Sequence, residues 1–324
     1  MQDITIKIIR EKEKLPEINN RNFFHSSTLF EILNDVPRVV PFMVTANDSE
    51  GNVVAHILAV IRKNTFVIPS IIRHGHIFGE GVYADECDKN RVFRMMLDAA
   101  TAEFKKHHCI YIEISGISAK MFGYGSLRAA GYFPIRWMEI HNSLHSKSPA
   151  QRLLPIRRKR ILKAAAAGVK THLVKNDETF RRFFSMLKHF YTSRLHRYSP
   201  NKQEVYAIGT SSYGKMYVTK YKDRIIGGCV CIISDGDAYL WHMASKRKTF
   251  STLFPTSQMI WHALEDAHQN GIHHFNFMDV GIPVGKSHLR DFILSFGGRP
   301  VSSYRWFNCS IIGVNKILSK IFTS

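Results

Sequence analysis

The sequence predicts a mixed α/β protein built from two tandem copies of one domain. Three observations support this prediction. Motifs recur in the same order in the two halves of the chain, and each half reads as a helix, two strands, a helix and a strand. The chain is also large enough for two cores, because 45% of its 324 residues are hydrophobic.

The repeat is clearest around two pairs of histidines. "HHCIYIEIS" from His107 matches "HHFNFMDVG" from His273. The same offset pairs "GYFPIRW" from Gly131 with "GGRPVSSYRW" from Gly297, and a slightly larger one pairs "NVVAHILAVI" with "RIIGGCVCII". Each match is weak alone, but their common order predicts an internal duplication.

The elements follow the same series in each half. Helical spacing covers residues 23–33 and 179–195, and two strands joined by a tight polar turn follow, "NDSEGN" in the first half and "KDR" in the second. The next helix spans 91–107 or 255–271, the second opened by Pro255 and stopped by Gly271. A strand then follows directly, "CIYIEIS" or "FNFMDVG".

A basic segment separates the two copies. "PIRRKRILKAAAAGVK", residues 155–170, holds six basic side chains and no acid. An apolar stripe of Leu154, Ile161 and Ala165 predicts an amphipathic helix with its other basic residues off the stripe and only Arg158 intruding on it. We therefore expect domains at 1–150 and 171–324, joined by a linker helix at 151–170.

Two roles for the linker stay open. Its cations either remain solvated, or Arg157, Arg158 and Arg160 bind phosphate at the seam of the domains, where ligand clefts tend to form. The composition favours anionic ligands in general, because 45 Lys and Arg against 26 Asp and Glu give a net charge of +19. Nucleic acid, a nucleotide-bearing substrate, an acidic membrane surface and coenzyme A all fit this charge.

Cysteine and histidine patterns predict no metal site. The five cysteines include no Cys-x-x-Cys, and the 17 histidines show no ligand spacing such as His-Glu-x-x-His. The first residues, "MQDITIKIIR", alternate like a strand and do not resemble a signal peptide. We expect a cytoplasmic protein, with contact to the inner face of the membrane as an alternative.

The second half resembles the Fem-type aminoacyl transferases and their acyltransferase relatives of the GNAT superfamily. The resemblance lies in "YKDRIIGGCVCI", "AYLWHMAS", "PTSQMIWHALEDAHQNGIHHFNFMDVG" and "HLRDFILSFGG", together with the basic segment between two similar domains. It implies two GNAT-like domains, with the active site in the second. It also implies transfer of an acyl or aminoacyl group to an amine of a phosphate-bearing, cell-envelope precursor. Aminoacyl-tRNA, acyl carrier protein and acyl-CoA stay open as donors, and no tightly bound cofactor is implied.

Two family features are missing. The GNAT loop of the type Arg/Gln-x-x-Gly-x-Gly/Ala, whose amides hold a pyrophosphate, is absent, and the nearest segment, "SKRKTFSTLFP", offers cations such as Lys246 but no glycine. Ile293 stands where Fem-type enzymes often carry a lysine before the closing strands. Arg290, one helical step earlier, or Lys286 is expected to replace that lysine and to stabilise an oxyanion.

The candidate proton acceptor is Asp279. It ends a predicted core strand, where a carboxylate would take a proton from an attacking ammonium or orient the amine, although a turn or capping role explains it equally well. Trp241 and His242 alternate in "YLWHMAS" and would line a groove, or else pack as a buried strand. Glu80, between two glycines, would bind an amine at the seam, or the glycines only form a turn.

The tail "IIGVNKILSKIF" predicts a basic amphipathic helix. Apolar Ile311, Val314, Leu318 and Ile321 recur at helical spacing beside two lysines, Lys316 and Lys320. We favour docking onto its own domain over contact with an anionic membrane surface.

Three functions compete at this point. The first is an N-acyl or aminoacyl transferase with its site in the second domain near the seam. The second is a nucleic-acid-binding protein that uses the cationic linker, although no recognition helix, zinc finger or RNA-binding motif accompanies it. The third is a binding member of the same fold without catalysis, which Ile293 favours.

Overall fold

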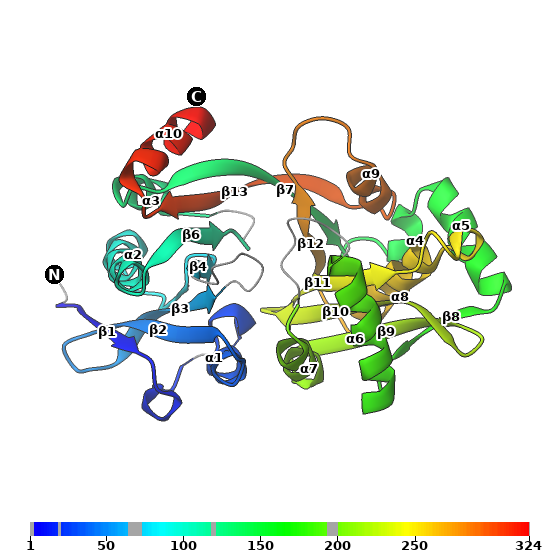
Figure 1. Ribbon diagram of the computed structural model, residues 1–324, viewed down its shortest axis with the longest axis horizontal. Helices are drawn as coiled ribbons and strands as arrows, with labels where there is room; N and C mark the ends of the chain where they lie inside the picture. Colours follow the sequence, from blue (N-terminus) through cyan, green and yellow to red (C-terminus); the bar gives the residue numbers. More distant parts are fainter. Residues whose placement is uncertain (1–2, 19–20, 64–72, 118–120, 193–199, 324) are drawn as a thin grey trace. The chain divides into compact units, whose positions relative to one another are not determined.

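The computed structural model describes residues 3–18, 21–63, 73–117, 121–192 and 200–323 (Figure 1). The chain divides into two compact units, Met1–Trp137 with Ser302–Ser324, and Met138–Val301. These units differ from the consecutive domains expected at 1–150 and 171–324. The expected domain boundaries therefore stay a prediction. The mixed α/β class is confirmed, because each unit is a sheet covered by helices.

The sheet of the first unit has the strand order β1-β2-β3-β4-β6-β13, with β5 beside β3. Neighbouring strands are antiparallel except β4 and β6, which are parallel. The strands are β1 (Thr5–Ile9), β2 (Val39–Asn47), β3 (Val53–Lys63), β4 (Arg73–Phe78), β5 (Val82–Tyr83), β6 (Cys109–Ser115) and β13 (Arg299–Cys309).

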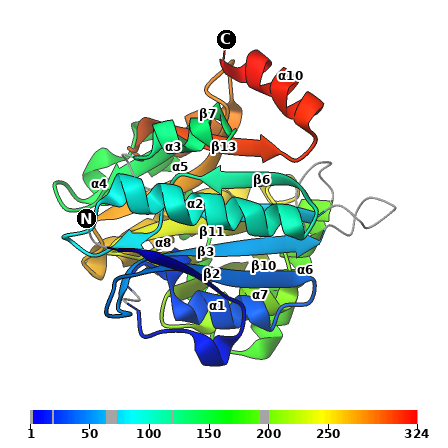
Figure 2. The same cartoon turned by 90° about the vertical axis from the view of Figure 1, so that its left-hand side faces the viewer.

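Helices cover both faces of this sheet. The long helix α2 (Lys89–Lys106) lies across β2, β3 and β6, as Figure 2 shows, and α1 (Ser27–Asn34) packs against β2 on the other face. The alternation of β2 explains the two layers, since Phe42 and Val44 join the core under α2 while the intervening residues face away. The remaining helical elements are η1 (Lys12–Lys14), η2 (Phe23–His25), α3 (Tyr124–Ala129) and α10 (Ile312–Thr323).

The second unit repeats this plan. Its strand order is β7-β12-β11-β10-β9-β8, and β11 and β12 form the parallel pair in an otherwise antiparallel sheet. The strands are β7 (Phe133–Ser143), β8 (Val169–Leu173), β9 (Gly214–Tyr221), β10 (Arg224–Ser234), β11 (Asp237–Ser245) and β12 (His274–Gly281).

Strand β10 carries helices on both faces. Cys229 and Cys231 join the core under α8 (Pro255–Gln269), whereas Val230 joins the core under α6 (Asp177–Thr192). Gly228 permits the close approach of α6, because a Cβ there would lie 2.6 Å from the ring of Phe183. The other helical elements are α4 (Pro149–Arg152), α5 (Pro155–Ala166), α7 (Lys202–Thr210), η3 (Ser251–Leu253) and α9 (His288–Leu294).

Each sheet takes its final strand from the opposite half of the chain. Residues 305–309 of β13 pair with β6 in the first unit, and residues 138–143 of β7 pair with β12 in the second. The repeat segment "GYFPIRW" ends at Trp137, just before the paired stretch of β7, and "GGRPVSSYRW" ends at Trp306, within the paired stretch of β13. Within the described residues, no helix is both long and apolar enough to cross a membrane.

Candidate functional site

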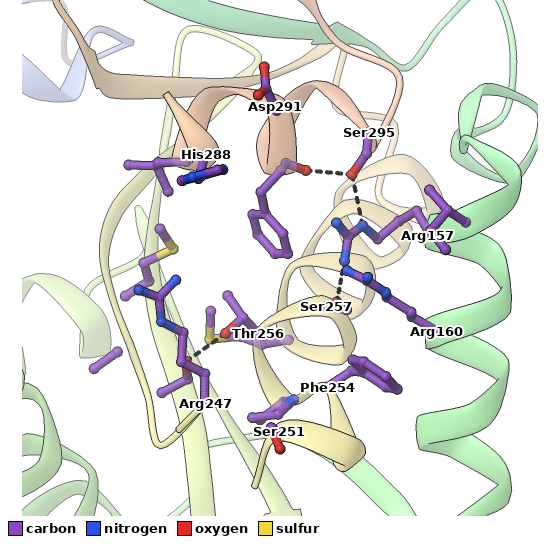
Figure 3. A pocket seen from close by; sticks show the side chains of 18 of the residues that line it. Arg157, Arg160, Arg247, Ser251, Phe254, Thr256, Ser257, His288, Asp291 and Ser295 are labelled. Carbon is purple, nitrogen blue, oxygen red and sulfur yellow. Dashed lines mark hydrogen bonds between the residues drawn. The ribbon is translucent and has the colours of Figure 1, made fainter. Parts of the chain in front are cut away.

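A cavity of about 560 Å³ opens in the second unit where β11 ends and α8 begins (Figure 3). Its walls come from α5, α6, the loop at 246–254, the first turn of α8, and α9. The lining residues include cationic side chains and a largely apolar remainder, among them Phe190, Tyr191, Met243, Phe254, Met259, Leu289 and Phe292. This mixture suits an anionic ligand that also carries an apolar group.

The first turn of α8 leaves its amino end open to the cavity. Pro255 occupies the first helical position, and Phe254 before it adopts a left-handed backbone conformation with φ of 45°. No side chain of the described residues caps this helix. The positive end of the helix dipole therefore faces the cavity without a carboxylate to offset it.

Arg157 of α5 forms part of the cavity wall although it is almost completely buried, at 3% exposure. Its Nε donates to Ser295 Oγ at 2.8 Å and an Nη to Ser257 Oγ at 2.6 Å. Its guanidinium carbon lies 4.2 Å from the centre of the Phe292 ring. The helical-wheel expectation for this residue was wrong: Arg157 is four positions before Ile161 and shares its buried face.

The charge of Arg157 has no opposite partner in the described parts of the chain. Its pKa falls to about 10, because burial penalises the charged form and Arg160 lies nearby. A buried cation is costly unless it is paired. An anionic ligand in the cavity would supply the missing partner.

Two further arginines border the same opening. Arg160, one turn after Arg157, lies with its guanidinium carbon 5.4 Å from the centre of the Phe254 ring, and Arg247 comes from the loop after β11. Figure 3 shows Arg157 and Arg160 on one side of the opening and Arg247 on the other. Asp291 also lines the cavity, but its carboxylate lies at the top of this view, away from the two arginines of α5.

The segment that builds this cavity has a recognisable family. Residues 152–282 match the acetyltransferase (GNAT) domain family. This segment therefore resembles a GNAT-type acetyltransferase domain. None of the curated proteins is significantly similar to the whole chain in sequence.

Solved structures extend the likeness to both units. The structure of FemX superposes with a TM-score of 0.67 at 11% identity, over 94% of this chain and 99% of that one. The C-terminal domain of a protein described as a lysylphosphatidylglycerol synthetase, from Agrobacterium fabrum, gives 0.59 at 11% identity over 92% and 91%. A tandem GNAT protein from the clavulanic acid biosynthesis pathway gives 0.56 at 11% over 94% and 98%. The resemblance to Fem-type and tandem GNAT proteins is thus confirmed at the level of fold.

The GNAT domain of this chain lacks the glycine-rich turn at the start of its main helix. The segment between β11 and α8, residues 246–254, contains no glycine and carries Lys246, Arg247 and Lys248. Pro255 also removes one backbone N–H from the first turn. The side chains that border this opening include the guanidinium groups of Arg157, Arg160 and Arg247, which are hydrogen-bond donors.

The structure brings two of the three predicted linker arginines into one site. Arg157 and Arg160 line the cavity of the GNAT domain, whereas Arg158 lies beside Lys159 in a separate hollow and donates to the carbonyl of Ala150 at 2.7 Å. The segment predicted as a linker at 151–170 is thus one wall of a site within the second unit.

The predicted groove residues Trp241 and His242 on β11 do not line this cavity. His242 Nδ1 lies 3.2 Å from the hydroxyl of Tyr191, which does, and the Trp241 ring packs edge-on against the His242 ring at 5.8 Å. His242 is therefore placed to orient Tyr191.

Three other predicted residues lie apart from the cavity. Lys246 borders a second hollow together with Arg181, Arg182 and Arg224, on the α6 and β10 side. Lys286 is exposed in the loop before α9. Glu80 belongs to the first unit, where it is 7% exposed and its backbone carbonyl accepts from the Tyr83 hydroxyl at 2.6 Å.

A contact between the two predicted catalytic residues, Asp279 and Arg290, falls outside the described part of the chain. Asp279 lies on β12, but its side chain is outside the described part of the chain. Arg290 donates to the carbonyl of Gly285, with an Nη 3.9 Å from Met138 Sδ, and it does not line the cavity. Ile293, at the position of the Fem-type lysine, is a core residue at 2% exposure.

Sequence reasoning missed several residues of the site. Arg247 stood within the basic "SKRKTF" segment and could have been found there, because it is next to the predicted Lys246. Ser257, Ser295 and Phe292 gave no signal, since their role depends on Arg157 reaching them across the fold. Among the described residues, no group of three or more His, Cys, Asp or Glu could hold a metal ion.

Proposed function

We propose that this chain is an N-acyltransferase whose GNAT domain binds an activated, phosphate-bearing acyl or aminoacyl donor in the cavity beside α5 and α8. The observation that carries the proposal is Arg157, a buried cation in the cavity wall with serine partners and no carboxylate partner among the described residues. Arg160 and Arg247 add positive charge to the opening. The match of residues 152–282 to the acetyltransferase domain family supports transferase activity.

The donor is one that carries both a phosphate and an activated acyl group. Aminoacyl-tRNA, acyl carrier protein and acyl-CoA all meet this description, and the apolar side chains of the cavity would pack on a base or an acyl chain. The names of the structural neighbours, FemX and a lysylphosphatidylglycerol synthetase, favour an aminoacyl group moved to a phosphate-bearing envelope precursor. The arginines would hold the phosphate in place of the missing glycine-rich turn.

The reaction joins an amine to the acyl carbon. The nitrogen lone pair attacks the carbonyl, a C–N bond forms, the bond to the donor oxygen or sulfur breaks, and the nitrogen releases a proton. We assign the proton to Asp279, whose strand β12 lies parallel to β11, and the transient oxyanion to Arg290 or Lys286. On the acceptor side we retain Trp241, His242 and Lys246 of the second unit as binding residues, and Glu80 as a separate binding residue of the first unit.

A ligand screen with paired variants tests the donor site. The melting temperature of the chain is measured with an acetyl-CoA, an acylated acyl carrier protein and a charged tRNA, since a ligand that binds only the folded state raises it. We expect one class to stabilise the wild type and to lose this effect in Arg160→Ala/Arg247→Ala. The control is Lys159→Ala/Lys248→Ala, which removes the same charge from the adjacent positions outside the cavity.

The outcomes separate clearly. Equal loss in both double variants would indicate general electrostatic attraction and overturn the cavity as the donor site. Absence of stabilisation by every donor class, together with no transfer of a labelled acyl group to an amine, would overturn the transferase. Generic DNA or RNA binding that falls steeply with salt and depends on Lys159 would instead support the nucleic-acid alternative.

A further inference from the structure

The helix α10 leaves an unusual amount of apolar surface uncovered. Six of its large apolar side chains, or those next to it, are between 40% and 73% exposed: Ile311, Ile312, Val314, Ile317, Ile321 and Phe322. Of the stripe that was expected to dock, Ile311, Val314 and Ile321 are exposed, so the contacts of α10 with its own unit leave these three side chains uncovered. An uncovered apolar stripe on a helix indicates a surface that binds something else.

Fixed contacts set which side of α10 faces outward. Asn315 accepts from the backbone N of Cys309 at 2.8 Å and donates to the carbonyl of Gly131 at 3.0 Å. Near the other end, the Phe322 ring stacks on Phe133 with centroids 6.0 Å apart. These contacts hold one side of the helix against its own unit, so the exposed residues present a constant face.

The outward face has an apolar row beside a cationic row. Val314, Ile317 and Ile321 follow one another at spacings of three and four residues, and Lys316 and Lys320 form the adjacent row. A hollow of about 480 Å³ between α10 and the segment 128–134 adds Arg128 to the same two lysines. None of the described residues that line this hollow is acidic, and the sequence has no Asp or Glu after Asp291.

We propose that α10 docks on the surface of an anionic phospholipid bilayer. Val314, Ile317 and Ile321 enter the headgroup region, while Arg128, Lys316 and Lys320 contact lipid phosphates. The charge decides the occupant: a second copy of the helix, placed face to face, would bring lysines against lysines, whereas an anionic bilayer complements both rows. The inference is independent of the proposed donor site, which lies in the other unit.

Vesicle sedimentation tests this surface. Wild-type chain is mixed with vesicles of phosphatidylcholine alone, or of equal parts phosphatidylcholine and phosphatidylglycerol. We expect binding to the anionic vesicles only, weakened by salt. Ile317→Ser/Ile321→Ser should reduce this binding at least about tenfold, since buried apolar area drives interfacial binding. Lys316→Ala/Lys320→Ala should reduce it about twenty-five-fold, from roughly fivefold for each lysine.

Matched variants exclude general effects. Ile282→Ser/Val284→Ser removes two exposed apolar residues from the second unit, and Lys105→Ala/Lys106→Ala removes two exposed cations from the end of α2. Both should bind vesicles like the wild type, and all variants should melt at the wild-type temperature. Unchanged vesicle binding in Ile317→Ser/Ile321→Ser would overturn the proposal. So would a wild-type dimer that this variant makes monomeric, together with no binding to the vesicles.

Discussion

The two units begin their main helices in opposite ways. In the first unit, Asp88 caps α2 and its carboxylate accepts from the backbone N of Arg91 at 3.2 Å. In the second, Phe254 precedes α8, Pro255 is its first residue, and no described side chain caps it. The strand order around the two helices is the same, including the single parallel pair. The two units therefore share a fold but differ in the residues at this helix end, where we propose that an anion binds in the second unit.

This difference explains why the ligand cavity belongs to the second unit. A carboxylate at the start of α2 offsets the positive end of the helix dipole and occupies its first amides. At α8 that end stays open and faces Arg157 and Arg160 of α5. Among the described residues, the two copies share a common scaffold, and the features of the proposed anion site lie in the second copy.

The largest expected change in the free energy of unfolding comes from substitutions in α3 and α9, the short helices that follow β6 and β12. Each unit buries one apolar residue there, Leu127 in α3 at 0% exposure and Ile293 in α9 at 2%. Ile293→Lys would place the Fem-type lysine in a packed core, and an unpaired buried cation should lower the free energy of unfolding by about 4 kcal/mol. Leu127→Lys should cost a similar amount by urea denaturation. A well-folded Ile293→Lys protein would show that α9 has room for the family lysine and that this equivalence fails.

The sequence predicted the repeated elements because their signals are local. Helices α2 and α8 and strands β6 and β12 follow from hydrophobic period, Pro255 and Gly271. The source of each sheet's last strand was not predictable, since the similar segments "GYFPIRW" and "GGRPVSSYRW" do not indicate that the strand each one enters will pair in the opposite unit. Choice of partner there depends on tertiary packing.

The site was predictable only in part, for the same reason. A charge run identified the arginines of α5, but burial of Arg157 depends on Ser257 and Ser295, which are 100 and 138 residues away in the chain. A helical wheel assigns apolar residues to the buried face. It therefore does not predict the burial of a cationic side chain that stacks on an aromatic ring. Long-range polar partners of this kind leave no local pattern.

Acid should destabilise the first unit before the second. His25 and His56 are buried in the first unit, and burial lowers the pKa of His25 to about 3, with the His56 charge contributing, and that of His56 to about 4. Above pH 6.5 both are neutral in the folded and unfolded states. Below it the unfolded chain binds protons that the folded chain does not, so the free energy of unfolding falls as pH decreases from 6.5 toward 4, by about 2 kcal/mol between pH 6.5 and pH 5.5.

Hydrogen exchange locates this loss. The backbone N of Leu58 donates to His25 Nδ1 at 3.1 Å, so amides of β3 should lose protection between pH 7 and 5.5 while those of β9 and β10 do not. His25→Gln/His56→Gln should reduce the pH dependence of β3. Parallel loss in both units would show that their acid stability does not differ.

A smaller effect, on the affinity for the donor, is expected when a carboxylate like that of Asp88 in α2 is placed at the start of α8. Phe254→Asp would place a negative charge at the opening near Arg160, and we expect affinity for the donor class found by thermal shift to fall about thirtyfold, in the range of one lost charge-assisted contact. Phe254→Asn has the same shape without the charge and should bind severalfold better than Phe254→Asp. Equal affinities would mean that the amino end of α8 does not contact the anion.

The reciprocal change in the first unit should affect stability alone. Asp88→Ala removes the hydrogen bond to the backbone N of Arg91, and loss of an N-cap of this kind costs about 1 kcal/mol. Asp88→Asn keeps a capping oxygen and should recover most of that loss, because the cap depends on hydrogen bonding more than on charge. Neither variant should alter binding of the donor, which belongs to the other unit. A donor affinity that rises in Asp88→Ala would indicate that the uncapped α2 has become a second anion site, and the difference between the two helix ends would then rest on this single carboxylate.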